Sequence, residues 1–212
     1  MSMFGEGRTD YARGELNESD VDPDPLVELA RWLDDAIAAD IVEPTGMAVS
    51  TVDPNGRVSS RNVLLRGIDR GRLQFFTNYE SDKAILLDLN PQCSLLFSWF
   101  GLQRQIRVEG AAERLDDAAS DAYFASRPRE SQIGAWASPQ SSVIAGREVL
   151  DEWVAEVGQR FDGVDVPRPP FWGGYGVAPD RVEFWQGRPN RLHDRLRYRL
   201  DQDRWVLERL AP

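Results

Sequence analysis

The side chains most able to do chemistry are concentrated near the C-terminus, in residues 182–195. This stretch holds Trp185, several arginines and the only histidine of the chain, His193. Its first residues alternate between apolar and polar, which predicts a strand. The Gly-Arg-Pro-Asn segment that follows predicts a turn.

Beyond this turn, Arg191, His193 and Arg195 are spaced by two residues. Their side chains therefore point the same way if the chain is extended. Two guanidiniums that flank an imidazole on one face are unfavourable unless an anionic or electron-rich group lies there. We predict a ligand site, with a solvated edge strand as the alternative on composition alone.

A second group of candidates could bind phosphate. A phosphate monoester carries a charge of about −1.5 to −2 near neutral pH and binds several directional donors. Arg61, Arg66 and Lys83 lie in a segment that reads as strands and turns. Taken alone, each of the three is better explained as a surface charge.

A third group is formed by Tyr123, Arg127 and Ser131. Pro128 disfavours helical geometry at Arg127 and is well placed to open the next helix. Arg127 and Ser131 then fall near a helix N-terminus, which is a natural site for an anion. The alternative is a helix–turn–helix in which Ser131 is a surface polar residue.

Composition excludes several classes of function. The 212 residues, 42% hydrophobic and 28% charged, predict one globular domain. A net charge of −10 argues against nucleic acid as the main partner, because phosphate contacts need a basic face. No apolar run approaches the roughly 18–20 residues of a membrane span, and the N-terminus lacks an apolar signal core. We therefore expect a cytoplasmic protein without a membrane partner.

Metal and hydrolase chemistry have little support in the sequence. Cys93 is the only cysteine, so an internal disulfide and a cysteine-rich metal site are excluded. One histidine also rules out a histidine-based metal cluster. No G-x-S-x-G motif accompanies His193, as a Ser–His–Asp hydrolase of that type would require.

The elements that position these residues follow from hydrophobic spacing. Asp24 and Pro25 predict the start of a helix whose core-facing residues are Leu26, Leu29, Ala30, Leu33 and Ile37. Further helices are predicted over residues 82–89, capped by Ser81, and over 116–126, 130–137 and 147–161. Strands are predicted over 47–52, 57–66, 73–78, 93–99, 103–112, 175–177, 182–186, 195–198 and 204–209. This predicts an α+β domain, residues 22–212, in which helices pack on an antiparallel barrel. A mobile segment, residues 1–21, precedes it.

The C-terminal stretch resembles the signature of the pyridoxamine/pyridoxine 5'-phosphate oxidase family. An aromatic pair follows a glutamate (Glu183, Phe184, Trp185), and after a short turn comes Arg-aliphatic-His-acid-Arg, residues 191–195. The resemblance extends from about residue 8 to residue 212. It implies a split β-barrel that binds flavin mononucleotide (FMN) as a homodimer, with sites built across the subunit interface.

The resemblance assigns one set of residues to FMN. These are Arg61, Phe76, Thr77, Lys83, Gln105, Gln140, Ser141, Trp185 and Arg195. Arg61 and Lys83 match positions that hold the FMN phosphate, whereas Gln105, Trp185 and Arg195 match positions at the isoalloxazine ring. A cationic group near the flavin N1/C2 carbonyl stabilises the reduced anion. Taken alone, Trp185 would also be explained as a core aromatic.

A second set is assigned to the substrate, pyridoxamine or pyridoxine 5'-phosphate. These are Arg8, Tyr11, Arg66, Tyr123, Arg127, Ser131, Arg191 and His193. Tyr123, Arg127 and Ser131 would bind the phosphate, while Arg191 and His193 would place the pyridine ring as the catalytic pair. The implied reaction moves a hydride equivalent from C4' to flavin N5, and O2 then reoxidises the flavin to give H2O2 and pyridoxal 5'-phosphate.

Two positions depart from the family pattern. Arg66 stands where a lysine is common, and because arginine is longer and planar the pocket must differ. Asp82 stands where an arginine is common beside Lys83, which places an anion near a phosphate dianion. Asp82 could weaken FMN binding or could cap its helix and face solvent.

Two other functions stay open. One is a related flavin oxidase of the phenazine-pathway type, acting on another aromatic substrate. The other is a flavin- or pyridoxal-phosphate-binding protein without turnover. Retention of Tyr123, Arg127 and Ser131 favours a phosphorylated substrate, and the Arg191–His193 pair argues against loss of turnover.

Overall fold

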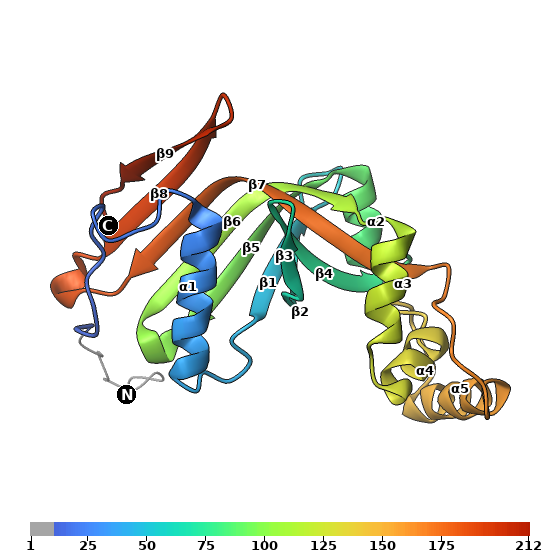
Figure 1. The fold of residues 1–212 in the computed structure, drawn as a ribbon. Helices are drawn as coiled ribbons and strands as arrows, with labels where there is room; N and C mark the ends of the chain where they lie inside the picture. The colour runs from blue at the N-terminus through green and yellow to red at the C-terminus, as the bar shows by residue number, and fades with distance from the viewer. Residues whose placement is uncertain (1–10) are drawn as a thin grey trace, which may run out of the picture. The chain divides into compact units, whose positions relative to one another are not determined.

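A computed structural model of the chain describes residues 11–212 (Figure 1), so Arg8 lies outside the described residues. The helices are α1 (Pro25–Ala38), α2 (Asp82–Leu89), α3 (Asp117–Ala125), α4 (Arg129–Ala137) and α5 (Arg147–Arg160). The strands are β1 (Gly46–Val52), β2 (Val58–Leu64), β3 (Gly67–Asp69), β4 (Arg72–Asn78), β5 (Gln92–Trp99), β6 (Arg104–Arg114), β7 (Trp172–Gln186), β8 (Asp194–Asp201) and β9 (Arg204–Arg209). Short 3-10 turns occupy Phe100–Leu102 and Pro189–Arg191. None of the helices in residues 11–212 is long and apolar enough to span a membrane.

Helix α1 begins where the sequence predicts, but its buried face differs. The Asp24 side chain accepts a hydrogen bond from the Leu26 N–H, as an N-cap residue does. The face is centred on Trp32, whose ring meets Phe184 edge-on at 5.0 Å. Ile37 follows Trp32 by five residues and so points away from it, and its side chain is 55% exposed. The prediction that Ile37 and Ala30 face the core was wrong.

The strands join in the order β2-β1-β5-β6-β7-β4-β3, and β8 pairs with β7 and with β9. The ladders β3–β4, β4–β7, β7–β8 and β8–β9 are antiparallel. This confirms the α+β class with an antiparallel sheet.

Strand β7 is one long strand where two short ones were predicted. Its residues 172–177 pair with β4 and its residues 181–186 pair with β8. Pro179 lies between these two ladders, so its missing N–H interrupts neither of them. A proline at this point is therefore compatible with a continuous strand.

The described residues form two compact units. The first contains residues 11–48, 94–109 and 179–212, and the second contains residues 49–93 and 110–178. In the first unit, Phe184 packs edge-on against Trp32 and Tyr198. In the second unit, α3, α4 and α5 follow one another along the chain (Figure 1). The same unit contains a cluster of buried residues, Phe124, Phe161, Val166 and Trp172.

Residues 11–21 form no helix or strand but bond to the rest of the first unit. The N–H groups of Ala12 and Arg13 donate to Gln103 Oε1, at 3.0 and 3.2 Å. The Leu16 N–H donates to Asp194, and the Leu16 side chain is buried. The division into a mobile segment, residues 1–21, and a single domain stays a prediction.

Candidate functional site

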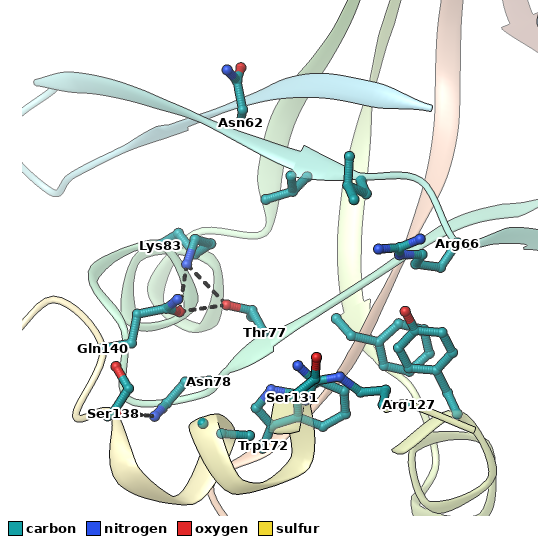
Figure 2. A pocket seen from close by; sticks show the side chains of 16 residues that line it. Asn62, Arg66, Thr77, Asn78, Lys83, Arg127, Ser131, Ser138, Gln140 and Trp172 are labelled. Carbon is teal, nitrogen blue, oxygen red and sulfur yellow. Dashed lines mark hydrogen bonds between the residues drawn. The ribbon is translucent and has the colours of Figure 1, made fainter. Parts of the chain in front are cut away.

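A cavity of about 430 Å³ in the second unit brings together most of the phosphate-site candidates (Figure 2). Strand β4 contributes Phe76 and Thr77, and helix α3 and the turn after it contribute Tyr123 and Arg127. Arg66, Lys83 and Arg127 are its cations, and none of the described residues that line it carries a carboxylate. A cationic lining of this kind suits an anionic ligand.

Lys83 lies at one side of this cavity, in the first turn of α2. Its Nζ donates to Thr77 Oγ1 and Gln140 Oε1, both at 2.9 Å (Figure 2). It also donates to Ser81 Oγ at 3.2 Å. Burial lowers the pKa of Lys83 to about 8; the nearby Arg61 adds to this effect and Asp82 opposes it. A buried ammonium with only neutral partners is favourably placed to bind an anion.

Arg127 lies at the other side, together with Arg66 (Figure 2). Its guanidinium stands 4.6 Å from the Trp172 ring centroid, next to the stacked rings of Phe76 and Tyr123, whose centroids are 3.8 Å apart. Burial lowers the pKa of Arg127, and the charge of Arg66 lowers it further. Nη1 of Arg127 is buried without a hydrogen-bond partner in residues 11–212. An orphaned donor of this kind fits a phosphate oxygen.

Ser131 also lines the cavity, in the first turn of α4. The peptide N–H of Ser131 donates to the Pro128 carbonyl at 2.9 Å, and α4 begins directly after Pro128, which was predicted to open this helix. Tyr123, Arg127 and Ser131, which were predicted as one group, therefore line a single cavity.

Arg61 does not line the cavity. Its guanidinium donates to Thr51 Oγ1 at 2.8 Å and to the side chain and carbonyl of Ser59 at 2.6 and 3.1 Å. Burial lowers the pKa of Arg61, and Asp82 opposes the change. Arg61 is thus held by β1 and β2, although it lies close enough to Lys83 to lower the pKa of that residue.

Asp82 and Ser141 meet at the start of α2. The Asp82 N–H donates to Ser141 Oγ at 3.3 Å, and Ser141 has a left-handed backbone, with φ 75°. The Asp82 side chain is exposed, yet its charge acts on Arg61 and Lys83. Asp82 thus faces solvent and also places a negative charge near the two cations, and its effect on FMN binding stays a prediction.

A second cavity, of about 240 Å³, lies in the first unit. It gathers Gln105, Trp185 and Arg195, the three residues expected at a flavin ring. Arg107 and Glu183 line it as well, and neither was assigned a role from the sequence. Arg107 follows Gln105 by two residues on β6, so strand alternation could have identified it.

Glu183 joins two of the guanidiniums at this cavity. Its Oε1 accepts from Arg195 Nε at 2.8 Å, and its Oε2 accepts from Arg107 Nη2 at 2.6 Å. Only 7% of Glu183 is exposed. Arg195 also donates from Nη1 to the Ala211 carbonyl at 2.9 Å, so two edges of its guanidinium are held.

His193 lies beside Trp185, with ring centroids 4.6 Å apart, and Tyr11 meets both rings edge-on. The Arg188 N–H donates to His193 Nδ1 at 3.1 Å, so the neutral ring carries its proton on Nε2. Burial lowers the pKa of His193, and Arg191 lowers it further. His193 is therefore a neutral ring with an Nε2–H donor at physiological pH.

Tyr11 depends on the absence of a side chain at Gly187. A Cβ at Gly187 would lie 2.9 Å from Tyr11 Cγ and 3.1 Å from the Gln103 Cβ. The start of the turn therefore requires glycine for a close approach.

The reasoning from spacing was wrong for Arg191. Asn190 and Arg191 have φ of 56° and 64°, inside the 3-10 turn Pro189–Arg191, and β8 begins only at Asp194. Arg191, His193 and Arg195 therefore do not lie on one extended strand. Two consecutive left-handed residues without glycine are a strained arrangement, which is frequent at functional sites.

Comparisons with known proteins cover nearly the whole chain. Residues 33–161 match the family described as pyridoxamine 5'-phosphate oxidase, and residues 172–212 match the pyridoxine 5'-phosphate oxidase C-terminal dimerisation region. Pyridoxine/pyridoxamine 5'-phosphate oxidase 1 of Ralstonia nicotianae is 52% identical, over 100% of both chains. The enzyme of that name from Rubrobacter xylanophilus is 51% identical, over 97% of this chain and 94% of its own.

Two solved structures are also similar. PhzG from Burkholderia lata, in complex with tetrahydrophenazine-1-carboxylic acid, has a TM-score of 0.87 at 34% identity, over 92% of this chain and 95% of its own. A pyridoxamine 5'-phosphate oxidase-related FMN-binding protein from Nostoc punctiforme has a TM-score of 0.71 at 17% identity, over 89% of this chain and 98% of its own. The latter likeness concerns the fold alone.

Proposed function

Because this chain belongs to the pyridoxamine 5'-phosphate oxidase family, we propose that it is an FMN-dependent oxidase of pyridoxamine and pyridoxine 5'-phosphates. The products are pyridoxal 5'-phosphate and H2O2, with O2 as the electron acceptor. Full-length relatives that carry this name at 52% and 51% identity support the proposal. We also propose that the protein is located in the cytoplasm.

The observation that carries the proposal is the cavity of the second unit. It combines three cations, no lining carboxylate among the described residues, and an unpaired buried donor on Arg127. Arg66, Tyr123, Arg127 and Ser131 would bind the substrate phosphate there. A ligand without phosphate would leave Arg127 Nη1 without its partner.

The residues present also fit FMN. Lys83 with Thr77 and Gln140, next to Ser141 and Arg61, offers donors for its phosphate, and Phe76 lines the same cavity. Gln105, Trp185 and Arg195 form a separate cavity that would line its ring. When bound, FMN supplies the acceptor for the hydride equivalent that leaves C4' and passes the electrons to O2.

The chain's own residues place the substrate. Arg191, exposed on its strained turn, would hold the pyridine ring, and His193 would donate a hydrogen bond from Nε2. Tyr11, together with Arg8 of the segment outside the described residues, would help to enclose the substrate. Such positioning contributes to the rate by fixing C4' in a reactive orientation.

The C-terminal dimerisation region supports a homodimer. Each complete site would combine the phosphate residues of one protomer with the ring-side residues of its partner.

A mixing experiment tests this arrangement, since Arg127→Ala and Arg191→Ala protomers should each be inactive alone. Mixed after mild unfolding and refolding, they should recover about a quarter of wild-type activity, because half the dimers carry one intact site. No recovery would place both arginines in the same protomer's site.

An absorbance spectrum tests the function itself. The purified protein should show a flavin band that bleaches on anaerobic addition of pyridoxamine 5'-phosphate and returns with air. A band that pyridoxamine 5'-phosphate does not bleach would contradict the substrate, and no band after added FMN would contradict the cofactor.

A phenazine-type substrate is the second candidate, favoured by the likeness to PhzG at 34% identity. Anaerobic addition of a reduced phenazine carboxylate to the same preparation separates the two. Bleaching by this compound, without bleaching by the phosphate, would favour it over the vitamin. A flavin band that responds to neither compound would favour the third reading, a binding protein without turnover.

A further inference from the structure

The ring-side cavity contains one side-chain carboxylate among the described residues that line it, that of Glu183. Both of its oxygens are occupied, Oε1 by Arg195 Nε at 2.8 Å and Oε2 by Arg107 Nη2 at 2.6 Å. Its side chain is only 8% exposed, against 27% for Arg195 and 45% for Arg107. Solvent therefore screens the carboxylate least of the three.

The bridge formed by Glu183 fixes the orientation of the Arg195 guanidinium and the net charge of the side chains that line the cavity. Arg195 is held through Nε by Glu183 and through Nη1 by the Ala211 carbonyl, which leaves the N–H groups of Nη2 for a ligand. Glu109, which does not line the cavity, also pairs with Arg107, with 3.1 Å between Nε and Oε1. The charged side chains that line the cavity are two guanidiniums and one carboxylate, so their net charge is +1. Loss of the carboxylate would raise it to +2 and release one edge of Arg195.

We propose that Glu183 is a positioning residue that holds Arg195 at the flavin ring and, by cancelling one of two positive charges, lowers the reduction potential of the bound FMN. The inference rests on the proposed function, because it places the ring in this cavity. No role of this kind follows from the sequence signature, where Glu183 only precedes the aromatic pair.

The physical reason is the charge of the reduced flavin. A cation near the ring stabilises the reduced anion, so each added positive charge makes the flavin a stronger oxidant. A stronger oxidant accepts a hydride equivalent more readily and gives electrons to O2 less readily. Glu183 would thus balance the two halves of the catalytic cycle.

The test is the reduction potential of bound FMN in Glu183→Gln, measured by anaerobic titration against a reference dye. We expect a shift to more positive potential, together with faster reduction by substrate and slower reoxidation by O2. The matched control is Glu208→Gln, because Glu208 also bridges two arginines, with Arg197 at 2.6 Å and Arg199 at 3.4 Å, but does not line the cavity. Its potential should stay at the wild-type value.

Arg107→Gln provides a second variant with the opposite sign. It removes a cation and leaves Glu183 paired with Arg195, so the potential should become more negative. This variant keeps the proposal testable if Glu183→Gln does not fold.

The inference would be overturned if the potential of Glu183→Gln equalled that of the wild type, or if Glu208→Gln shifted it equally. It would also be overturned if Glu183→Gln and Arg107→Gln shifted the potential in the same direction. The proposed function is tested separately on the wild type, by FMN binding and by turnover. A wild type that turns over normally while Glu183→Gln leaves the potential unchanged would refute the inference alone.

Discussion

The guanidinium of Arg127 stands 4.6 Å from the ring centroid of Trp172, while its Nη1 is buried without a hydrogen-bond partner among the described residues. The aromatic ring offsets part of the unfavourable burial of the charge. It does not satisfy the N–H groups of Nη1. Arg127 is therefore held ready for an anion at the expense of the stability of the ligand-free protein.

Arg127→Met should separate these two effects. Loss of charged hydrogen bonds to the phosphate should raise KM for pyridoxamine 5'-phosphate about 10- to 100-fold. The free energy of unfolding, measured by urea denaturation without phosphate, should rise by about 1 kcal/mol, because a buried unpaired donor is removed. The matched control is Arg129→Met, since Arg129 donates to the carbonyls of Val164 and Phe161 and does not line the cavity. That variant should lose stability and keep its KM, and a loss of stability in Arg127→Met would contradict the interpretation.

FMN affinity should depend on pH through Lys83. Burial lowers the pKa of this lysine to about 8 from an ordinary value of 10.5, so the ammonium is lost as pH rises through about 8. The phosphate dianion binds the protonated form, and the FMN dissociation constant should therefore rise between pH 7.5 and 9.5, about tenfold per pH unit at most. Fluorescence titration of FMN over this range measures it. Lys83→Met should bind more weakly with a flat profile, and an equal slope in that variant would assign the pH dependence to another group.

The same lysine affects the stability of the ligand-free protein. Because its folded pKa lies below its unfolded value, the unfolded chain binds more protons between about pH 8 and 10.5. Lys83 therefore makes stability rise with pH across this window. Urea denaturation at pH 8 and pH 10 should show a smaller rise, or a larger fall, in Lys83→Met than in the wild type.

Asp82→Asn should tighten FMN binding. The Asp82 carboxylate is exposed, yet it acts electrostatically on Lys83 and Arg61, so its removal should lower the FMN dissociation constant about two- to tenfold at low salt. Asp82 also occupies the first turn of α2, where a negative charge favours the helix by about 0.3–1 kcal/mol, so stability should fall slightly. Glu80→Gln, a nearby exposed carboxylate, is the control and should leave FMN affinity unchanged. A dissociation constant in Asp82→Asn that matches the wild type would show that Asp82 has no influence on the cofactor.

Arg191 and His193 can be studied together because the chain has one histidine. Arg191 contributes to lowering the pKa of His193, so Arg191→Ala should raise that pKa, as read from the single histidine signal in NMR titration. Turnover should fall strongly while the protein keeps its FMN. Arg204→Ala, at the start of β9, should change neither quantity. Normal turnover in Arg191→Ala would remove Arg191 from the site.

Local signals predicted most of the elements. Helix α2 and strand β9 have the predicted bounds, since Ser81 precedes the first and turn residues flank the second. The predictions are wrong where contacts between distant segments determine the structure. The buried face of α1 depends on the contact between Trp32 and Phe184, and the continuity of β7 depends on a change of partner at Pro179.

The site could also be predicted only in part, because some of its contacts join residues that are distant in the sequence. The resemblance named residues that gather in two cavities, including Tyr123 with Arg127 and Gln105 with Trp185. Spacing alone was misleading at Arg191, because its left-handed backbone is not visible in the residue types. The bridge from Glu183 to Arg107 joins β7 to β6, and such long-range pairs leave no local pattern.

The boundary between the two compact units crosses β1, β5, β6 and β7, so the chain passes from one unit to the other four times. Each unit is therefore built from separate pieces of sequence, and every continuous fragment that contains all of one unit also contains residues of the other. A split at any single loop between β1 and β7 would divide both units. Neither unit can therefore be expressed alone as a continuous piece of the sequence.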